Sequence, residues 1–175
     1  MKEKLQHLDG RYGEAYAGTS PDGVHINVVI ASRGSAAYAA GVSALLSPGP
    51  GHIPFLACLG LGNVVRPATV VINKVTIDNE RYERIFYGGA QLGIGQGVTD
   101  AVKEGLIGGE LAGEIALLVA CWVDPNASDE TNVRLNAREA MRGAIRNALS
   151  PVDEAALQRQ LQMYETARNN YYTGK

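Results

Sequence analysis

VHINVVI, residues 24–30, is the stretch around which the rest of the chain is organised. It is rich in β-branched residues, which favour strands. Side chains alternate across a strand, so His25 and Asn27 share one face while the aliphatic side chains share the other. Buried polar groups cost free energy unless they find partners. The stretch therefore predicts a strand over 24–31 with one apolar face and one face that carries a polar pair.

A second apolar stretch, VVINKVTI at residues 70–77, has the same arrangement. On a strand over 69–77, Lys74 and Thr76 share one face and Asn73 lies on the other. Each pair has a plain structural interpretation, because a strand histidine is more often structural than catalytic and a strand lysine can extend its stem to water. Two such strands together nevertheless predict a polar site on rigid elements, with His25 as the candidate general acid–base.

The composition indicates one globular domain and excludes several classes of protein. The chain has 175 residues, of which 46% are hydrophobic and 19% charged, and its net charge is −2. It has no long basic run, so a nucleic-acid partner held by phosphate contacts is not expected. No apolar run has the length of a transmembrane helix, so no membrane partner is expected. We expect a domain over 1–149 and a C-terminal helical extension over 150–175.

Cysteines, histidines and acidic residues argue against several kinds of site. Cys58 and Cys121 lie in apolar runs, and we interpret both as buried reduced thiols of a cytoplasmic protein. The N-terminal segment lacks the apolar core of a secretory signal. With three histidines and no CxxC pair, no metal site is expected. Neither a Gly-x-Ser-x-Gly motif nor a carboxylate pair in an apolar strand is present, so these two hydrolase mechanisms are not indicated.

The hydrophobic pattern predicts strands and helices in alternation. We expect strands at 14–18, 24–31, 53–60, 69–77 and 115–123, and helices at 35–46, 79–86, 90–105, 131–149 and 152–168. This order is typical of an α+β fold, a two-layer sandwich with helices packed on a mixed sheet.

Glycines and arginines add detail to the predicted helices. Gly88-Gly89 predicts a break before the helix at 90–105. Three further glycines inside that helix predict close packing against the sheet or another subunit, since each weakens a helix by roughly 1 kcal/mol relative to alanine. They are Gly93, Gly95 and Gly97. Four arginines at intervals of four residues are expected on the solvent side of the helix at 131–149. They are Arg134, Arg138, Arg142 and Arg146.

The chain resembles the formaldehyde-activating enzyme family in a series of short blocks. These are HINVVI followed by RGS at 33–35, GHIPFLA at 51–57, RPAT at 66–69, NKVTI at 73–77, Phe86, and GAQ at 89–91. The blocks occur in the family's order with similar spacing, and the resemblance extends over roughly residues 12–149.

This resemblance implies both a fold and an activity. Members of the family condense formaldehyde with tetrahydromethanopterin, giving methylene-tetrahydromethanopterin and water, a step of one-carbon metabolism and formaldehyde detoxification. The implied assembly is a homopentamer with pterin sites between subunits. The implied fold is an α+β sandwich like a ribosomal-protein domain 2, with a left-handed βαβ crossover. No metal, flavin or tightly bound cofactor is implied, and tetrahydromethanopterin is a co-substrate.

Carried over by position, the resemblance assigns roles to the polar pairs. His25 matches the family's proton donor, and the substrate-binding positions fall on Asn27, Leu56, Lys74, Thr76 and Gln91. The family pattern has an aspartate where this chain has Asn27, so a charge-assisted hydrogen bond becomes a neutral one. Two alternatives therefore stay open beside an active lyase. One is a catalytically weakened paralogue that binds or senses a reduced pterin or one-carbon adduct, and the other is a purely structural oligomer.

Overall fold

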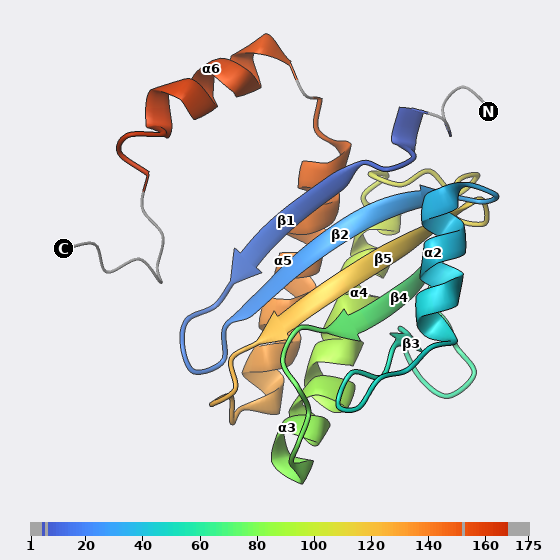
Figure 1. Cartoon of the computed structure of the whole chain (residues 1–175), viewed down its shortest axis with the longest axis vertical. Helices are drawn as coiled ribbons and strands as arrows, with labels where there is room; N and C mark the ends of the chain where they lie inside the picture. The colour runs from blue at the N-terminus through green and yellow to red at the C-terminus, as the bar shows by residue number, and fades with distance from the viewer. Residues whose placement is uncertain (1–4, 6, 152, 168–175) are drawn as a thin grey trace.

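The computed structural model describes residues 5, 7–151 and 153–167, and its centre is one mixed sheet of five strands (Figure 1). The strands are β1 (Tyr12–Ala17), β2 (Val24–Ser32), β3 (Phe55–Leu56), β4 (Ala68–Asn73) and β5 (Ile115–Val123), in the spatial order β1-β2-β5-β4-β3. β2 pairs antiparallel with β1 and β5, β4 pairs parallel with β5, and β3 pairs antiparallel with β4.

Two long helices cover one face of this sheet. α4 (Gln91–Lys103) and α5 (Glu130–Leu149) lie behind the sheet in the view of Figure 1, and α2 (Ala36–Leu45) lies in front of it. The fully buried side chains Ile26, Leu117 and Met141 belong to the core between the sheet and the two long helices. This layering confirms the expected α+β sandwich with a mixed sheet.

The connection between the parallel neighbours β4 and β5 is a helical crossover. It runs through α3 (Glu80–Arg84), the π-helical turn η1 (Ile85–Ala90) and α4. In Figure 1 this connection passes behind the sheet, both strands point to the lower left, and β5 lies on the β2 side of β4. A crossover so arranged is left-handed, whereas about 98% of such connections are right-handed. The expected left-handed βαβ unit is therefore present, while the likeness to a ribosomal-protein domain stays a prediction.

The predicted break at Gly88-Gly89 was wrong. Helical structure is continuous from Glu80 to Lys103, passing from α3 through η1 into α4. The glycine pair serves close packing instead, since a Cβ added to Gly89 would lie 2.7 Å from the backbone oxygen of Glu130. Absence of a side chain thus lets η1 lie directly against the start of α5.

Two predicted strands are shorter than expected. β3 covers only Phe55–Leu56, because Pro54 has no backbone N–H to donate and residues 57–65 turn back on themselves. β4 ends at Asn73, whose side-chain amide donates to the backbone oxygen of Gly51 at 2.6 Å. Such side chain–backbone bonds compete with a strand ladder. Lys74 and Thr76 therefore lie just beyond the strand rather than within it.

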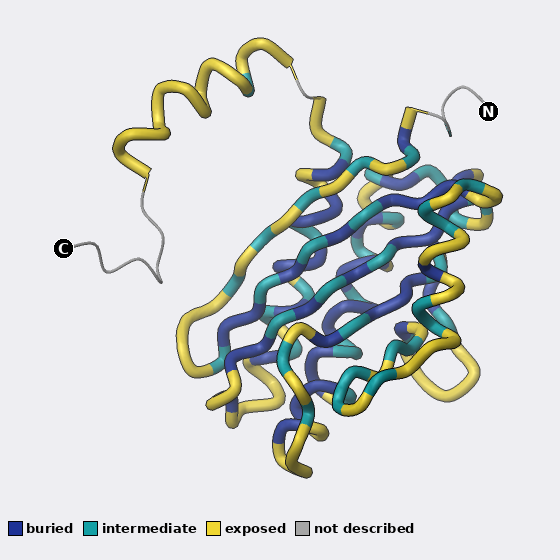
Figure 2. Tube along the Cα trace, in the orientation of Figure 1, coloured by how far each residue is buried: buried dark blue, intermediate teal, exposed yellow. Residues whose placement is uncertain are grey.

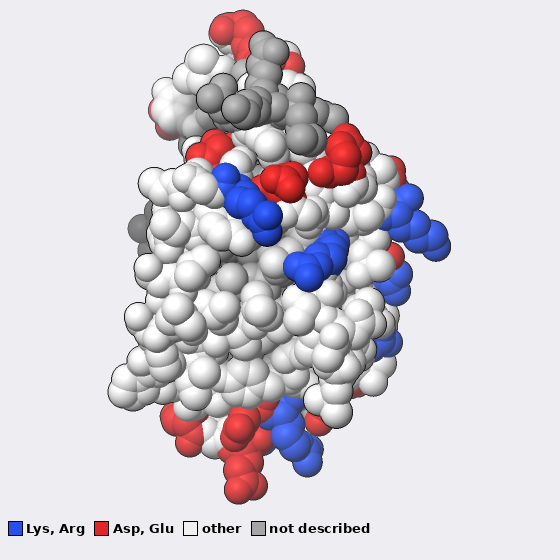
Figure 3. All heavy atoms as spheres, turned by 90° about the vertical axis from the view of Figure 1, so that its right-hand side faces the viewer, with Lys and Arg blue, Asp and Glu red and all other residues white. Residues whose placement is uncertain are grey.

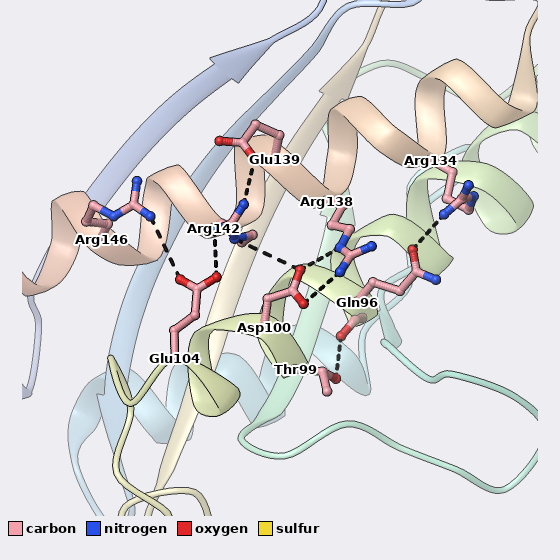
Figure 4. A network of polar contacts seen from close by, with 10 residues as sticks. Gln96, Thr99, Asp100, Glu104, Arg134, Arg138, Glu139, Arg142 and Arg146 are labelled. Carbon is pink, nitrogen blue, oxygen red and sulfur yellow. Dashed lines mark hydrogen bonds and ion pairs between the residues drawn. The ribbon is translucent and has the colours of Figure 1, made fainter.

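The arginines of α5 are also not a simple solvent face. Figure 4 shows them directed toward carboxylates and an amide of α4. Arg138 forms a two-pronged contact with Asp100, at 2.5 and 2.8 Å, and this hydrogen bonding lowers the pKa of Asp100. Arg142 donates to Glu104 at 2.6 Å. The stripe therefore links α4 to α5 across their exposed edge.

The C-terminal helix α6 (Glu154–Met163) does not contribute to the core. It contains no buried residue, and Figure 1 shows it apart from the sheet and its helices. The predicted helix over 152–168 is thus shorter, and its two end residues lie outside the described part of the chain. Among the described residues, no helix has the length and apolar character needed to cross a membrane.

Candidate active site

The site is built on the sheet face that α4 and α5 leave uncovered. Figure 2 shows β2 and β5 alternating along much of their length between buried residues and residues of intermediate exposure. His25 and Asn27 lie on the less buried face, as the sequence pattern predicts. The register places Tyr16 of β1 and Trp122 of β5 on either side of His25. A half-covered face with aromatic neighbours is a suitable wall for a flat ligand.

His25, Asn27 and Lys74 converge on this face. Lys74 Nζ lies 3.2 Å from His25 Nδ1, and it also donates to Asn27 Oδ1. The backbone N–H of Lys74 donates to Cys121 O at 2.8 Å, which keeps the residue beside β5 although β4 has ended. Three of the sequence-predicted site residues are therefore in one cluster.

A carboxylate joins the cluster from the edge strand. Glu14 of β1 has its Oε2 atom 2.8 Å from His25 Nε2. The imidazole ring is thus held at both nitrogens, by a carboxylate on one side and a lysine amine on the other. Burial lowers the pKa of Lys74, because an ammonium ion loses hydration there.

Thr76 lies two residues further along, where a second histidine holds it. His52 Nδ1 is 2.9 Å from the backbone oxygen of Asn73, and His52 Nε2 is 3.1 Å from Thr76 Oγ1. A carbonyl oxygen only accepts, so Nδ1 of His52 carries the hydrogen. In the neutral ring Nε2 then accepts the Thr76 hydroxyl hydrogen, which leaves the oxygen of Thr76 free to accept from a ligand.

Leu56 and Gln91 are not brought to His25. Leu56 is on β3, which is separated from β2 by β5 and β4, a span of roughly 14 Å at the usual strand spacing. Gln91 begins α4, and its Nε2 atom donates to Cys58 Sγ at 3.0 Å, two residues after Leu56. The chain thus carries two separate groups of predicted site residues, one around His25 and one at the β3 edge.

An apolar hollow adjoins the His25 cluster. Its volume is about 310 Å³, and it lies between α2 and the sheet. Asn27 contributes to its wall together with Val29, Ile72 and Leu118. The closeness of α2 depends on Gly41, where an added Cβ would lie 2.3 Å from Leu118 Cδ2.

The thiols of the two cysteines take no part in the His25 cluster. Cys121 is fully buried on the opposite face of β5, and burial raises the pKa of its thiol to about 12. Cys58 is only half-buried, so the expectation that both thiols are buried was correct for Cys121 alone. Within the described residues, no three His, Cys, Asp or Glu side chains are grouped so that they could hold a metal ion.

Comparison with known proteins identifies the family. Residues 12–168 match the sequence model of the formaldehyde-activating enzyme (Fae) family. The chain is 34% identical to 5,6,7,8-tetrahydromethanopterin hydro-lyase of Methanosarcina barkeri, over 86% of this chain and 85% of the relative. It is 30% identical to the bifunctional enzyme Fae/Hps of Archaeoglobus fulgidus, over 81% of this chain but only 36% of that longer relative. The chain therefore belongs to the formaldehyde-activating enzyme family. The match continues through α6, beyond the boundary expected at residue 149.

Sequence reasoning did not assign roles to Glu14 and His52. His52 lies inside the GHIPFLA block that resembles the family, but the sequence alone does not show that it contacts Thr76. Glu14 lies in the predicted edge strand, and only the β1–β2 register shows that it reaches His25. Cross-strand contacts of this kind follow from register, which a single strand pattern does not give.

Proposed function

We propose that this protein condenses formaldehyde with tetrahydromethanopterin to give methylene-tetrahydromethanopterin and water. The observation that carries the proposal is the contact between His25 and Lys74, 3.2 Å apart on the half-covered sheet face, in a chain of the formaldehyde-activating enzyme family. The printed activity of the Methanosarcina relative supports the choice of pterin. The proposal requires no tightly bound cofactor or metal, and we place the reaction in the cytoplasm.

His25 is the proton donor in this proposal. A pterin amine attacks formaldehyde and forms a carbinolamine. His25, as imidazolium, gives a proton to the carbinolamine hydroxyl, the C–O bond breaks, and water leaves while the nitrogen lone pair forms an iminium. A second pterin nitrogen then closes the ring and returns one proton to His25. General acid catalysis of this kind contributes roughly 100- to 10,000-fold to a rate.

The remaining site residues bind and orient the pterin. Lys74 and Asn27 offer an amine and an amide beside His25, and the Thr76 oxygen offers an acceptor held by His52. Leu56 supplies apolar contact and Gln91 a polar group from the β3 edge. Holding the two reactants in one geometry can contribute as much as the proton transfer itself.

The separation of the two residue groups supports a site shared between copies of the chain. One chain would supply His25 and Lys74, and its neighbour Leu56 and Gln91, as expected for a homopentamer. On the side that Figure 3 turns toward the viewer, the area between a group of charged side chains in the upper half and the charged lower edge is largely free of charged side chains. Several exposed apolar residues belong to α2 and the segment that follows it: Val42, Leu46, Ile53, Leu56, Leu59 and Leu61. An exposed apolar surface of this kind is typical of an interface.

The test is acceleration of the reaction above its spontaneous rate. Purified protein is mixed with tetrahydromethanopterin and formaldehyde, and the methylene product is followed with time. With tetrahydromethanopterin we expect an initial rate proportional to protein concentration. The same assay with tetrahydrofolate measures the pterin selectivity. A rate independent of protein concentration with both pterins would contradict the proposed function.

A further inference from the structure

We propose that Glu14 is a positioning residue for His25, and that it makes Nδ1 the ring nitrogen that carries the transferable proton. This inference deepens the proposed function and rests on it. Its basis is geometric: the two ring nitrogens of His25 face groups of opposite hydrogen-bonding character, Glu14 at Nε2 and Lys74 at Nδ1.

The contact at Nε2 fixes one hydrogen. Glu14 lies directly opposite Asn27 in the β1–β2 register, so His25 is its diagonal neighbour, within reach of a long side chain. The ionised carboxylate of Glu14 only accepts, and its distance of 2.8 Å from Nε2 is that of a hydrogen bond. Nε2 therefore carries a hydrogen whether the ring is neutral or charged.

The contact at Nδ1 leaves one proton to be shared. An ammonium group only donates, so Lys74 as a cation can face Nδ1 only when the ring is neutral. When Nδ1 carries the proton, the neutral amine of Lys74 accepts it or the ammonium turns to Asn27 Oδ1, its second contact. The loss of hydration that lowers the pKa of Lys74 disfavours its ammonium form, so it favours the neutral amine beside a protonated Nδ1, and the two groups share one positive charge.

The charges of the cluster give Glu14 a second role. His25, Asn27 and Lys74 bring one shared positive charge and no carboxylate, and Glu14 supplies the negative charge. Nδ1 gives its proton to the carbinolamine hydroxyl as water leaves, and the second pterin nitrogen returns a proton to Nδ1. Throughout these steps Nε2–H stays bonded to Glu14, so the ring neither turns nor changes the tautomer that the next step needs.

The tautomer of His25 tests this inference without any turnover. In protein with ¹⁵N-labelled histidine at alkaline pH, long-range ¹⁵N–¹H spectra distinguish protonated from bare ring nitrogens, and the chain has only three histidines to assign. We expect His25 of the wild type to be protonated at Nε2. We expect a mixture of tautomers in Glu14→Ala, and the wild-type tautomer in Glu14→Gln, whose amide oxygen still accepts.

Kinetics with the same variants test the link to the reaction. We expect kcat to fall about 10-fold or more in Glu14→Ala, a part of the effect of a general acid, with little change in KM for the pterin. The kcat of Glu14→Gln should lie between those of Glu14→Ala and the wild type. Glu165→Gln removes an exposed charge on the C-terminal segment, and its kcat should match that of the wild type. Circular dichroism checks that each variant is folded.

One outcome would overturn the inference, and a different outcome would mean failure of the proposed function. A wild-type tautomer and kcat in Glu14→Ala would remove Glu14 from the site. If the wild type did not accelerate condensation, but Glu14→Ala still changed the tautomer of His25, Glu14 would hold the ring without a catalytic role. The proposed function would then be wrong.

Discussion

Replacing His25 by alanine is expected to lower kcat for condensation by about 100- to 10,000-fold, the range for loss of a general acid. The carbinolamine would still form, because pterin binding does not depend on the imidazole, but its hydroxyl would leave without a proton. The initial rate of methylene product, with the spontaneous rate subtracted, measures this effect. KM for the pterin should change much less than kcat.

A second histidine variant controls for the His25 substitution. His7→Ala removes an exposed imidazole that is not part of the cluster around His25, and this variant should keep the wild-type rate. Equal rates for His25→Ala and the wild type would remove His25 from its role. A selective rise in KM would make it a binding residue instead.

Replacing Gly93 by alanine is expected to destabilise the protein by about 1–3 kcal/mol, although alanine is the better helix former by roughly 1 kcal/mol. An added Cβ would lie 2.2 Å from the backbone oxygen of Arg134 and 2.8 Å from Ala137 Cβ. α4 and α5 would have to separate, because a helix backbone cannot move one carbonyl alone. The midpoint of chemical unfolding, at one fixed protein concentration, measures the change.

Gly113 gives the matched comparison. It lies just before β5 and no atom lies within 4 Å of an added Cβ, so Gly113→Ala should leave the midpoint almost unchanged. If Gly93→Ala and Gly113→Ala had the same stability as the wild type, the close approach of α4 to α5 would be wrong. Gly97 offers a repeat of the test, since its added Cβ would lie 2.7 Å from Arg138 O.

The sequence predicted the central strands well because their patterns are strong. β5 has the predicted bounds, Ile115–Val123, and β2 differs by one residue at its end. Alternation within β2 placed His25 and Asn27 on one face, and the structure confirms this placement. An apolar strand with a polar pair has few other ways to fold, since a shift of one residue would bury the pair and expose the aliphatic face.

The errors arose where local signals compete with tertiary contacts. Gly88-Gly89 reads as a break, but the close approach to Glu130 keeps the helix continuous. The arginines of α5 read as solvated, since their acidic partners on α4 are distant in sequence. Glu14 was missed for the same reason, because its contact with His25 depends on the register of β1 against β2.

The central claim is that His25 of one chain acts on a pterin held by Leu56 and Gln91 of its neighbour. Hybrid oligomers test it most directly. His25→Ala chains and Leu56→Ala/Gln91→Ala chains, each inactive alone, are co-expressed with different tags and purified through both. With random mixing around a ring, about one site in four would have both halves intact, so roughly a quarter of wild-type activity should return. Hybrids that contain both chains yet stay at the spontaneous rate would contradict the claim.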